Sequence, residues 1–473
     1  MAHPRSGKYV SLPAPSAMLK SIRFMAHDPS TSMRRNEVIL PRLSGRHPDH
    51  LVFARLRTTY GTVNRVLCQV FLPQTNSEEL SLKFYPKPSQ VTILSVSPWF
   101  SLLAAGKQKG RGLTIRAEEV WSSGLSRGFQ DGISFATTFD GRPTWLEIVN
   151  RQARSPARMV KGGVFRITES PVLNTAVSIL RSYTGAVKVK TVSAPVFTLR
   201  NGLRLKFRKH FDTAKNSTGD MVTTSCLTAE FTARKPLKKS DFPKAVDEFG
   251  EYLNLVSFAA RYRCVCFRWV MWDRKGCLTT HYAQNVSRPT EKIPDSNETL
   301  IDIEDFPEFV RHAYREYIRM NSHDLLDNAI FALVSEPSTV EDRFLRYFLG
   351  LESVLSHFFR SQGGTNRAIQ VHDVFISFQQ KNQIDFTDLW PLTNHSAGVS
   401  LKELRNRIAH GIPVTPGQIK ALIYAAQNLR WILERSILGI LRWPISRSKV
   451  RSEFLRLNLA ARDWKSVINC FSP

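Results

Sequence analysis

The residues best suited to chemistry lie in a short polar stretch near the C-terminal end of the chain. Residues 401–411, LKELRNRIAHG, place two arginines, an amide and a histidine close together. A guanidinium remains protonated and binds phosphate oxygens in pairs, and an imidazole exchanges protons near neutral pH. These groups suit phosphoryl transfer, so we take Arg405, Asn406 and His410 as candidate catalytic residues, with Arg407 in support.

The same stretch carries the signals of a helix with defined ends. Ser400 and Glu403 have capping-box spacing, in which each side chain accepts a hydrogen bond from the backbone amide of the other residue. Gly411 suits the left-handed conformation that ends a helix. The apolar positions at helical spacing, which we expect to face a core, are Leu401, Leu404 and Ile408.

An ideal helix does not point all the candidate residues in one direction. Asn406 and His410 are four residues apart and share a face, whereas Arg405 and His410 are separated by roughly 140° around the helix axis. Either the helix end at Gly411 redirects the histidine, or a second element or a second chain completes the site.

A longer amphipathic helix precedes the motif and supplies a candidate acidic partner. Ser338 and Glu341 have the spacing of a capping box at its start. Glu352 lies at the edge of the apolar stripe of this helix. A partly buried carboxylate needs a partner, so we expect Glu352 to pair with Arg405 or Arg407; the alternative is an exposed glutamate among basic neighbours.

These features resemble a known family. An arginine, a polar residue, three further residues and a histidine, followed by glycine, are similar to the R-x4-6-H motif of HEPN-domain ribonucleases. The preceding EDRFLRYFLGLESVLSHFF resembles the Apea-like HEPN branch, as does the apolar helix that follows. That following helix is predicted to begin at Thr415-Pro416-Gly417-Gln418, where a cap, a proline and a capping-box glutamine coincide. The resemblance covers roughly Leu325 to Trp443.

The resemblance implies a helical bundle and a specific reaction. Paired bundles would form a composite cleft and cleave RNA without metal, leaving 2′,3′-cyclic phosphate ends. One histidine cannot act as base and acid at the same instant, so two copies across a two-fold axis are the economical arrangement. By resemblance we expect RNA as substrate, a homodimer, and action in bacterial defence against phage, released by a phage-derived trigger. No cofactor or metal is expected, because the other histidines and glycines lack the required spacing.

Other interpretations stay open at this point. Basic residues at a helix end also complement the negative C-terminal end of the helix dipole. The chain also fits a non-catalytic HEPN module that binds RNA or dimerises while another polypeptide does the chemistry. A basic DNA-binding regulator fits the charge, but the sequence has no helix-turn-helix or zinc-finger pattern.

The composition predicts a soluble, basic protein with a polyanionic partner. The 473 residues are 42% hydrophobic and carry a formal net charge of +26. This charge favours nucleic acid first and an anionic membrane surface second, and a generally basic protein is the alternative. No apolar run approaches the roughly 20 residues of a membrane span. Six cysteines without a C-x-x-C pair favour a reducing cytoplasm.

Changes in residue pattern predict an α+β protein of four segments. We expect a basic flexible arm over residues 1–58, a β-rich sensor or substrate domain over 59–285, a linker over 286–305, and the all-α domain with a basic tail over 306–473. The arm also fits a targeting segment or an over-extended start of translation.

The β-rich domain would be an antiparallel sandwich or barrel. Short runs with a period of two are separated by turn signals, which is the pattern of such folds. A helix is expected over residues 240–261, followed by another strand. The expected earlier strands are 66–72, 91–97, 112–121, 133–139, 143–149, 186–192, 203–211 and 221–234.

Overall fold

The computed structural model describes most of the 473-residue chain from residue 48 onward. Within it, residues 48–210 and 226–473 form one compact unit. The described residues are 48–73, 79–95, 97–108, 111–126, 129–130, 133–134, 138–150, 159–173, 177–181, 187–191, 196–215, 221–272, 278–283, 298–319, 323–364, 371–393 and 398–471.

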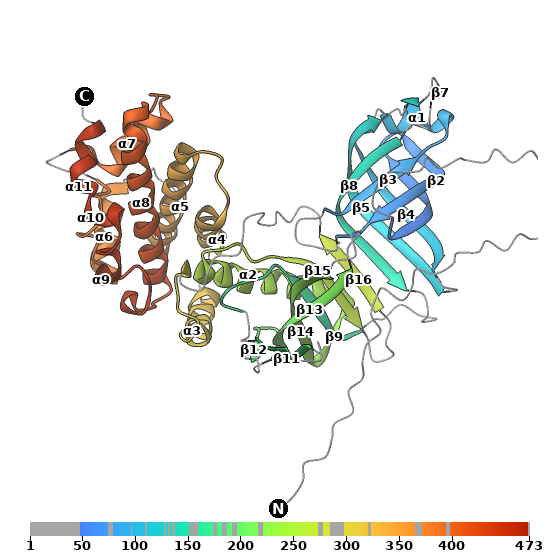
Figure 1. Ribbon diagram of the computed structural model, residues 1–473, viewed down its shortest axis with the longest axis horizontal. Coiled ribbons are helices and arrows are strands. Elements are labelled where there is room, and N and C mark those ends of the chain that lie inside the picture. Colours follow the sequence, from blue (N-terminus) through green and yellow to red (C-terminus); the bar gives the residue numbers. More distant parts are fainter. Residues whose placement is uncertain are drawn as a thin grey trace, which may run out of the picture. The chain divides into compact units, whose positions relative to one another are not determined.

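Six antiparallel strands near the start of the described chain close into a β-barrel (Figure 1). They are β1 (His50–Thr58), β2 (Gly61–Phe71), β3 (Ser81–Tyr85), β4 (Trp99–Gln108), β5 (Arg111–Ser126) and β8 (Thr138–Asn150). The order around the ring is β8-β3-β2-β1-β4-β5, and β5 pairs back to β8. Alternate residues of β1 are buried, because successive side chains of a strand point to opposite faces. The barrel interior is therefore a packed core.

The same sheet continues beyond β8 through six further strands in the order β16-β15-β9-β14-β13-β12. They are β9 (Met159–Ile167), β12 (Val196–Thr198), β13 (Leu203–Lys215), β14 (Met221–Lys238), β15 (Cys266–Trp272) and β16 (Leu278–Ala283). Helix α2 (Phe242–Ala260) packs on them, and its Phe249 stacks on Phe165 of β9 with ring centroids 4.3 Å apart. Two small hairpins complete the strands: β6 (Phe129–Gln130) with β7 (Ile133–Ser134), and β10 (Val177–Arg181) with β11 (Val187–Thr191).

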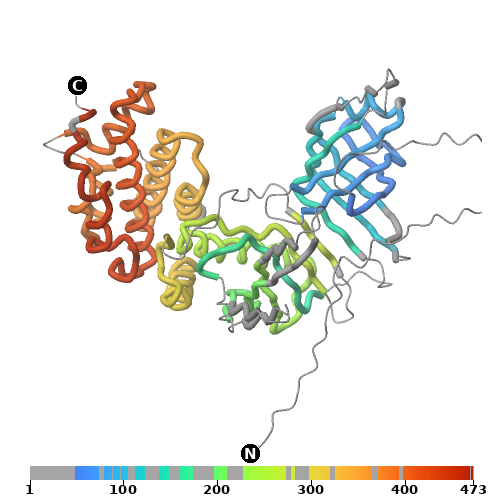
Figure 2. The backbone as a smooth tube through the Cα atoms, viewed as in Figure 1, coloured from blue at the N-terminus to red at the C-terminus, as the bar shows by residue number. Residues whose placement is uncertain are grey.

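From residue 306 the chain is helical, as the sequence predicts (Figure 2). Helix α8 contacts α4, α5, α10 and α11, and α5 also contacts α4, α6 and α7. The helices are α3 (Phe306–Ile318), α4 (His323–Val334), α5 (Val340–Ser361), α6 (Val371–Asn382), α7 (Leu401–Ala409), α8 (Ile419–Ile440), α9 (Ser452–Leu455), α10 (Leu459–Arg462) and α11 (Trp464–Val467). Short 3-10 turns lie between several of these elements. Turn η2 (Lys239–Asp241) precedes α2, and η4 (Pro416–Gln418) precedes α8. Turn η5 (Ile445–Arg447) follows α8, and η6 (Ile468–Phe471) ends the described chain. The α+β class with a barrel-containing N-terminal region is thus confirmed.

The buried residues form two cores, whose division differs from the expected domain boundary. One core fills the barrel between Val52 and Leu146, with Tyr282 added from β16. The other runs from Val160 to Phe471 and includes strands, α2 and the C-terminal helices. The expected boundary at residues 286–305 therefore lies within one continuous core, because α2 packs its apolar side chains against both the strands and the helices.

Several expected boundaries are wrong. Strand β1 (His50–Thr58) lies inside the range predicted as a flexible arm; residues 1–47 of that range fall outside the described residues. Leu300 and Ile301 of the predicted linker are fully buried, and residues 286–297 lie outside the described part. The basic tail, which was expected as part of the all-α domain, contains α9, α10, α11 and η6, with Trp464 and Phe471 buried.

Residues 91–97 were expected to form a strand, but they belong largely to helix α1 (Pro88–Ser95). The side chain of Gln90 accepts a hydrogen bond from the backbone of Lys87 at 2.9 Å, and Pro88 begins the helix. These are helix-start signals, and they outweigh the β-branched residues that favour a strand.

No helix in the described ranges is long and apolar enough to cross a membrane. Cys68, Cys264, Cys266 and Cys470 are free thiols. Burial raises the pKa of the Cys264 thiol to about 12, so this thiol is held in its unreactive form.

Candidate functional site

Helix α7 (Leu401–Ala409) presents the candidate catalytic residues, and local sequence signals set both of its ends. The backbone amide of Ser400 donates to Glu403 Oε2 at 2.7 Å, and the Glu403 amide donates to Ser400 Oγ at 3.3 Å, so the predicted capping box is confirmed. At the other end Gly411 has a φ of +74°. The amide of Gly411 donates to Ile408 O and that of Ile412 donates to Arg407 O, the two bonds of a Schellman motif.

The start of α7 is fixed by a buried polar network that follows α6. Leu401 and Leu404 are buried, as predicted. Trp390 is fully buried, and its Nε1 donates to Val399 O at 2.9 Å just before the cap. The Trp390 amide in turn donates to Oδ1 of the buried Asn428 on α8, at 3.0 Å. The register of the motif helix is therefore tied to α8 through hydrogen bonds that water does not reach.

The Arg405 guanidinium lies among three partners. Its Nη2 is 3.6 Å from Glu352 Oε1 on α5. Its Nη1 donates to Asn406 Oδ1 at 3.2 Å, and its Cζ lies 5.6 Å from the ring centroid of Phe348. Its side chain remains 34% exposed. The guanidinium is thus held by an acid, an amide and an aromatic face while one side stays open to a ligand.

Of the two arginines expected to pair with Glu352, the structure selects Arg405. Burial raises the pKa of Glu352, and the positive charge of Arg405 acts in the opposite direction. The carboxylate is only 31% exposed, so water stabilises its charge less than at the surface. The ionised form of Glu352 therefore depends on the positive charge of Arg405. Glu352 is therefore placed to orient Arg405.

Arg407 has a different role from the one expected. Its Nη1 donates to the backbone oxygen of Phe471, near the end of the described chain. Gln418 Nε2 donates to the oxygen of the neighbouring Cys470 at 2.9 Å. These two contacts fasten the last turn η6 to α7 and to the turn before α8. Of the two expected partners of Glu352, Arg407 is therefore not the one used, because its side chain donates to the C-terminal turn.

His410 stands at the end of α7 and not within it. The helix ends at Ala409, and His410 is the C-cap residue with φ −86° and ψ 10°. Its backbone amide donates to Asn406 O at 3.0 Å. The residue is exposed, and its imidazole makes no hydrogen bond or ion pair with any described side chain. The exposed imidazole is therefore accessible to a ligand.

The capping box expected at the start of α5 is displaced by one residue. The N-cap is Thr339, whose Oγ1 accepts the amide hydrogen bond of Asp342 at 3.1 Å. Asp342 also accepts hydrogen bonds from Ser338, so the expected pair with Glu341 does not form. Both registers carry a hydroxyl followed by an acid three positions later, and the sequence alone cannot separate them.

Two residues that serve the site escaped the sequence analysis of its chemistry. Phe348 lies under Arg405, but at helical spacing it is indistinguishable from the other apolar residues of α5. Asn428 is fully buried, and its helical spacing from the apolar Ala425 and Ile432 is the signal that could have found it. Among the described residues, no three His, Cys, Asp or Glu side chains gather in a way that could hold a metal ion.

At the predicted start of α8, Pro416 opens the 3-10 turn η4 and Gln418 Oε1 accepts the Thr415 amide at 3.1 Å, so the expected start signals are confirmed. Taken together, the site consists of an oriented cation, an amide, a carboxylate behind them and, one helical turn after Asn406, an exposed imidazole. It can bind an anion at Arg405 and exchange a proton at His410.

Comparisons with known proteins add little to this geometry. No protein-family model matches the chain, and no curated protein matches it. Among solved structures, the chain is similar to the crystal structure of YcgR in complex with c-di-GMP from Escherichia coli, with 10% sequence identity and a TM-score of 0.14 over 42% of this chain and 84% of that one. A likeness at this TM-score carries no argument about fold or function, so the site has to be interpreted from its own chemistry.

Proposed function

We propose that this chain is a metal-independent endoribonuclease of the HEPN type, which cleaves RNA in bacterial defence against phage when it is triggered. The single observation that carries the proposal is the Arg405 group. A guanidinium fixed by Glu352, Asn406 and Phe348 lies on the same helix as an exposed His410, five residues before it in the sequence. The resemblance of the sequence to Apea-like HEPN proteins supports the biological setting, with the barrel-containing region as the place where a phage-derived trigger would bind.

The proposed reaction uses the RNA itself as nucleophile. The ribose 2′-oxygen attacks the adjacent phosphorus and its proton passes to a base, the bond from phosphorus to the 5′-oxygen breaks, and an acid protonates that oxygen. His410 supplies proton transfer, and Arg405 neutralises the charge of the pentacovalent phosphate. Asn406 orients the phosphate or the guanidinium. The products are a 2′,3′-cyclic phosphate and a 5′-hydroxyl, and no metal ion is needed.

The proposal includes a homodimer, so that a second His410 supplies the other proton transfer. Isoleucines near the motif support such a pairing, because they are unusually exposed for apolar residues. Ile412 follows the motif directly and is 54% exposed, and Ile419 and Ile423 on one face of α8 are 44% and 46% exposed. A second copy of this chain would cover these side chains and bring two motifs together across a two-fold axis.

The test is cleavage of total RNA in EDTA by wild type and by His410→Ala. We expect cleavage by wild type and a loss of activity on the order of 10²-fold or more for the variant, as for removal of a general acid or base. The exposed position of His410 predicts an unchanged melting temperature. Cleavage at the wild-type rate by His410→Ala would overturn the assignment of the site.

A second candidate function is a non-catalytic module that binds RNA or dimerises. The observation in its favour is that Arg405 and His410 make no contact with each other within one chain. Such a module would bind RNA in a salt-dependent manner and leave the RNA intact with or without a trigger.

A further inference from the structure

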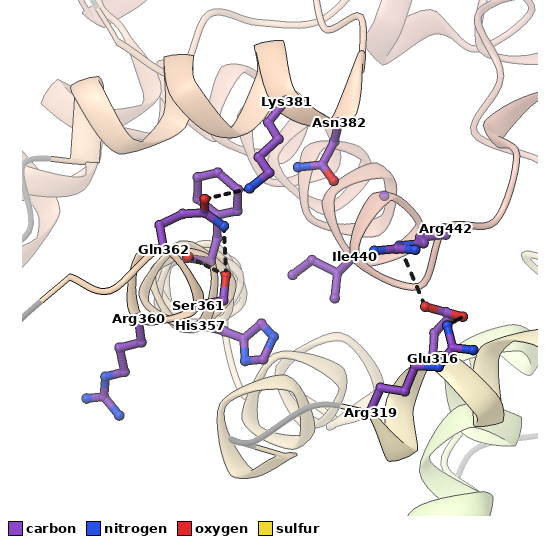
Figure 3. A pocket seen from close by; sticks show the side chains of 12 residues that line it. Glu316, Arg319, His357, Arg360, Ser361, Gln362, Lys381, Asn382, Ile440 and Arg442 are labelled. Atoms are coloured by element: carbon purple, nitrogen blue, oxygen red, sulfur yellow. Dashed lines mark hydrogen bonds and ion pairs between the residues drawn. The ribbon is translucent and has the colours of Figure 1, made fainter.

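A pocket of about 390 Å³ lies where four helices of the C-terminal region end (Figure 3). It is lined by residues from the last turns or caps of α3, α5, α6 and α8. Its volume falls within the range of roughly 300–1,000 Å³ that is usual for small-molecule sites. None of the proposed catalytic residues Arg405, Asn406 and His410 lines it. The pocket is therefore a separate feature of the helical region.

Positive charge dominates the pocket wall. Arg319, Lys381 and Arg442 line it together with one carboxylate, Glu316. Arg319 Nη1 lies 2.7 Å from Glu316 Oε1, and Arg442 Nε lies 3.6 Å from Glu316 Oε2. Both guanidinium groups are mostly exposed, at 60% and 74%. Because one carboxylate is shared by two arginines, positive charge remains for a further anion. Arg360 is the remaining cation of the wall, and Figure 3 shows it pointing away from the other side chains.

These cations are not required to satisfy the helix ends. Cations are common at helix C-termini because they interact with unpaired carbonyls and with the dipole. Three of the four helices already end in backbone-satisfied Schellman motifs, with amide bonds from Gly364 to Phe359 O in α5, and from Trp443 to Leu438 O in α8. In α6 the amide of Ile384 bonds the oxygen of Gln379 in the same way. Lys381 Nζ donates to Gln362 Oε1 and lies over the Phe358 ring, whereas Arg319 and Arg442 each have further guanidinium donors beyond those that face Glu316.

Arg442 occupies a backbone position that favours glycine. Its φ is +54°, in the left-handed region, at the C′ position of α8. A side chain in this conformation is less favourable than glycine, which has no Cβ to clash with the backbone. The equivalent positions after α5 and α7 are Gly363 and Gly411, with φ of +82° and +74°. Gln383 after α6 has the same backbone hydrogen bonds and a φ of +52°, so the conformation alone does not indicate a ligand, and the role of Arg442 rests on its guanidinium at the pocket.

The remaining wall suits the non-phosphate part of a small ligand. Figure 3 shows Asn382, Ile440 and His357 directed into the space between the charged groups. The amide can hydrogen-bond the edge of a polar ring, and Ile440 supplies an apolar surface. A guanidinium binds phosphate oxygens in pairs, which favours phosphate over a monovalent anion. We propose that this pocket binds a small phosphorylated ligand of the nucleotide class, with Arg319 and Arg442 as its phosphate contacts.

Calorimetric titration of the full-length protein with inorganic pyrophosphate and with ADP tests the site. We expect saturable binding of both with Kd below about 1 mM, and tighter binding of ADP because of the uncharged wall. Arg442→Gly removes the guanidinium and suits the left-handed backbone, so the variant should fold normally and bind pyrophosphate at least about tenfold more weakly. Arg319→Gln should weaken binding in the same way.

The matched control is Arg343→Gln, which removes an exposed arginine from α5 outside the pocket and should leave binding unchanged. The proposal is overturned if pyrophosphate does not bind, or if all variants bind it equally. It is also overturned if Arg442→Gly weakens binding of an RNA oligonucleotide but leaves the binding of pyrophosphate and ADP unchanged. Arg442 would then contact the RNA backbone and not a small ligand. His410→Ala should bind ADP like wild type, so failure of the nuclease proposal would not affect this result.

Discussion

At the scale of single residues, chemically identical side chains in one helix have different roles. Arg405 faces Glu352 and Phe348 on α5, whereas Arg407, two positions later, is bonded to the backbone of Phe471. Two residues correspond to roughly 200° of helix rotation, so the two side chains leave opposite faces of α7. The sequence showed the types of both residues, but only the packing of α5 and of the C-terminal turn decides which arginine is open to a phosphate.

Glu352→Gln should lower the rate of RNA cleavage while leaving the protein folded. The substitution keeps the size of the side chain but removes the charge that faces Arg405 at 3.6 Å. A guanidinium that is no longer held in place binds the phosphate less productively, and we expect a loss on the order of tenfold in kcat. Single-turnover cleavage measures it. Glu341→Gln, in the first turn of the same helix, is the control and should cleave at the wild-type rate.

His281 predicts part of the pH dependence of stability. Its imidazole stacks on Trp269 with ring centroids 5.3 Å apart. Burial lowers the pKa of His281 to about 4, although the negative charge of Glu147 acts in the opposite direction. The unfolded histidine, with a pKa of about 6.5, binds more protons than the folded one, so stability rises with pH through this window. The contribution is complete above pH 6.5 and is lost as the pH falls toward 4.

The loss should amount to roughly 2 kcal/mol of unfolding free energy at pH 5 relative to pH 7. Urea denaturation at both pH values measures it in wild type and in His281→Phe, which keeps an aromatic ring against Trp269 but does not titrate. We expect a smaller difference between the two pH values in the variant. Equal differences in both proteins would show that His281 does not carry this dependence.

At the scale of elements, signals that act within a few residues are predictable from sequence, and non-local pairings are not. The capping box at Ser400 and the end of α7 at Gly411 depend on neighbouring residues, and both are confirmed. The barrel closes through the pairing of β5 with β8, and β1 lies between β2 and β4. Such contacts are decided by the whole sheet, so the sequence alone does not place β1 in the barrel.

Gly411→Ala should destabilise the protein and weaken the site. The residue has a φ of +74°, and an added Cβ would meet no atom within 4 Å, so the cost is conformational only, on the order of 1 kcal/mol. The altered turn would also move His410, and cleavage should fall.

Gly417→Ala is the matched control for this substitution. It likewise has open space around a Cβ, but its φ is not in the left-handed region. Alanine at such a position stabilises by restricting the unfolded chain, by about 0.4–1 kcal/mol. The two variants should therefore shift the urea midpoint in opposite directions; a shift of the same sign would contradict the account of the α7 end.

At the scale of the whole molecule, the second core joins elements that the sequence analysis placed in separate domains. Glu434 on α8 is buried between Arg261 and Arg430; burial acts against its ionisation, but the two cations hold its pKa below the usual value. Arg261 caps α2, so this ion pair links the strand-bearing part of the core to α8. Buried charges of this kind come from distant parts of the sequence and have no local signature.

The proposed homodimer gives a prediction at this scale. Ile423→Glu places a charge on the exposed apolar face of α8, where a second copy would bury it. We expect the dimer Kd to rise by about 100-fold or more and cleavage to fall with it. Sedimentation equilibrium measures the association. Leu457→Glu, a substitution at a residue that is 84% exposed elsewhere in the region, should leave both properties unchanged.

The most direct test of the central claim is cleavage, in EDTA, of one defined RNA and of the same RNA with a single 2′-deoxy nucleotide at the cleavage position. Attack by the 2′-oxygen assisted by His410 predicts that wild type cleaves only the all-ribose RNA, leaving a 2′,3′-cyclic phosphate, and that His410→Ala cleaves neither. Equal cleavage of the deoxy-substituted RNA, or 3′-hydroxyl ends on the products, would contradict the account.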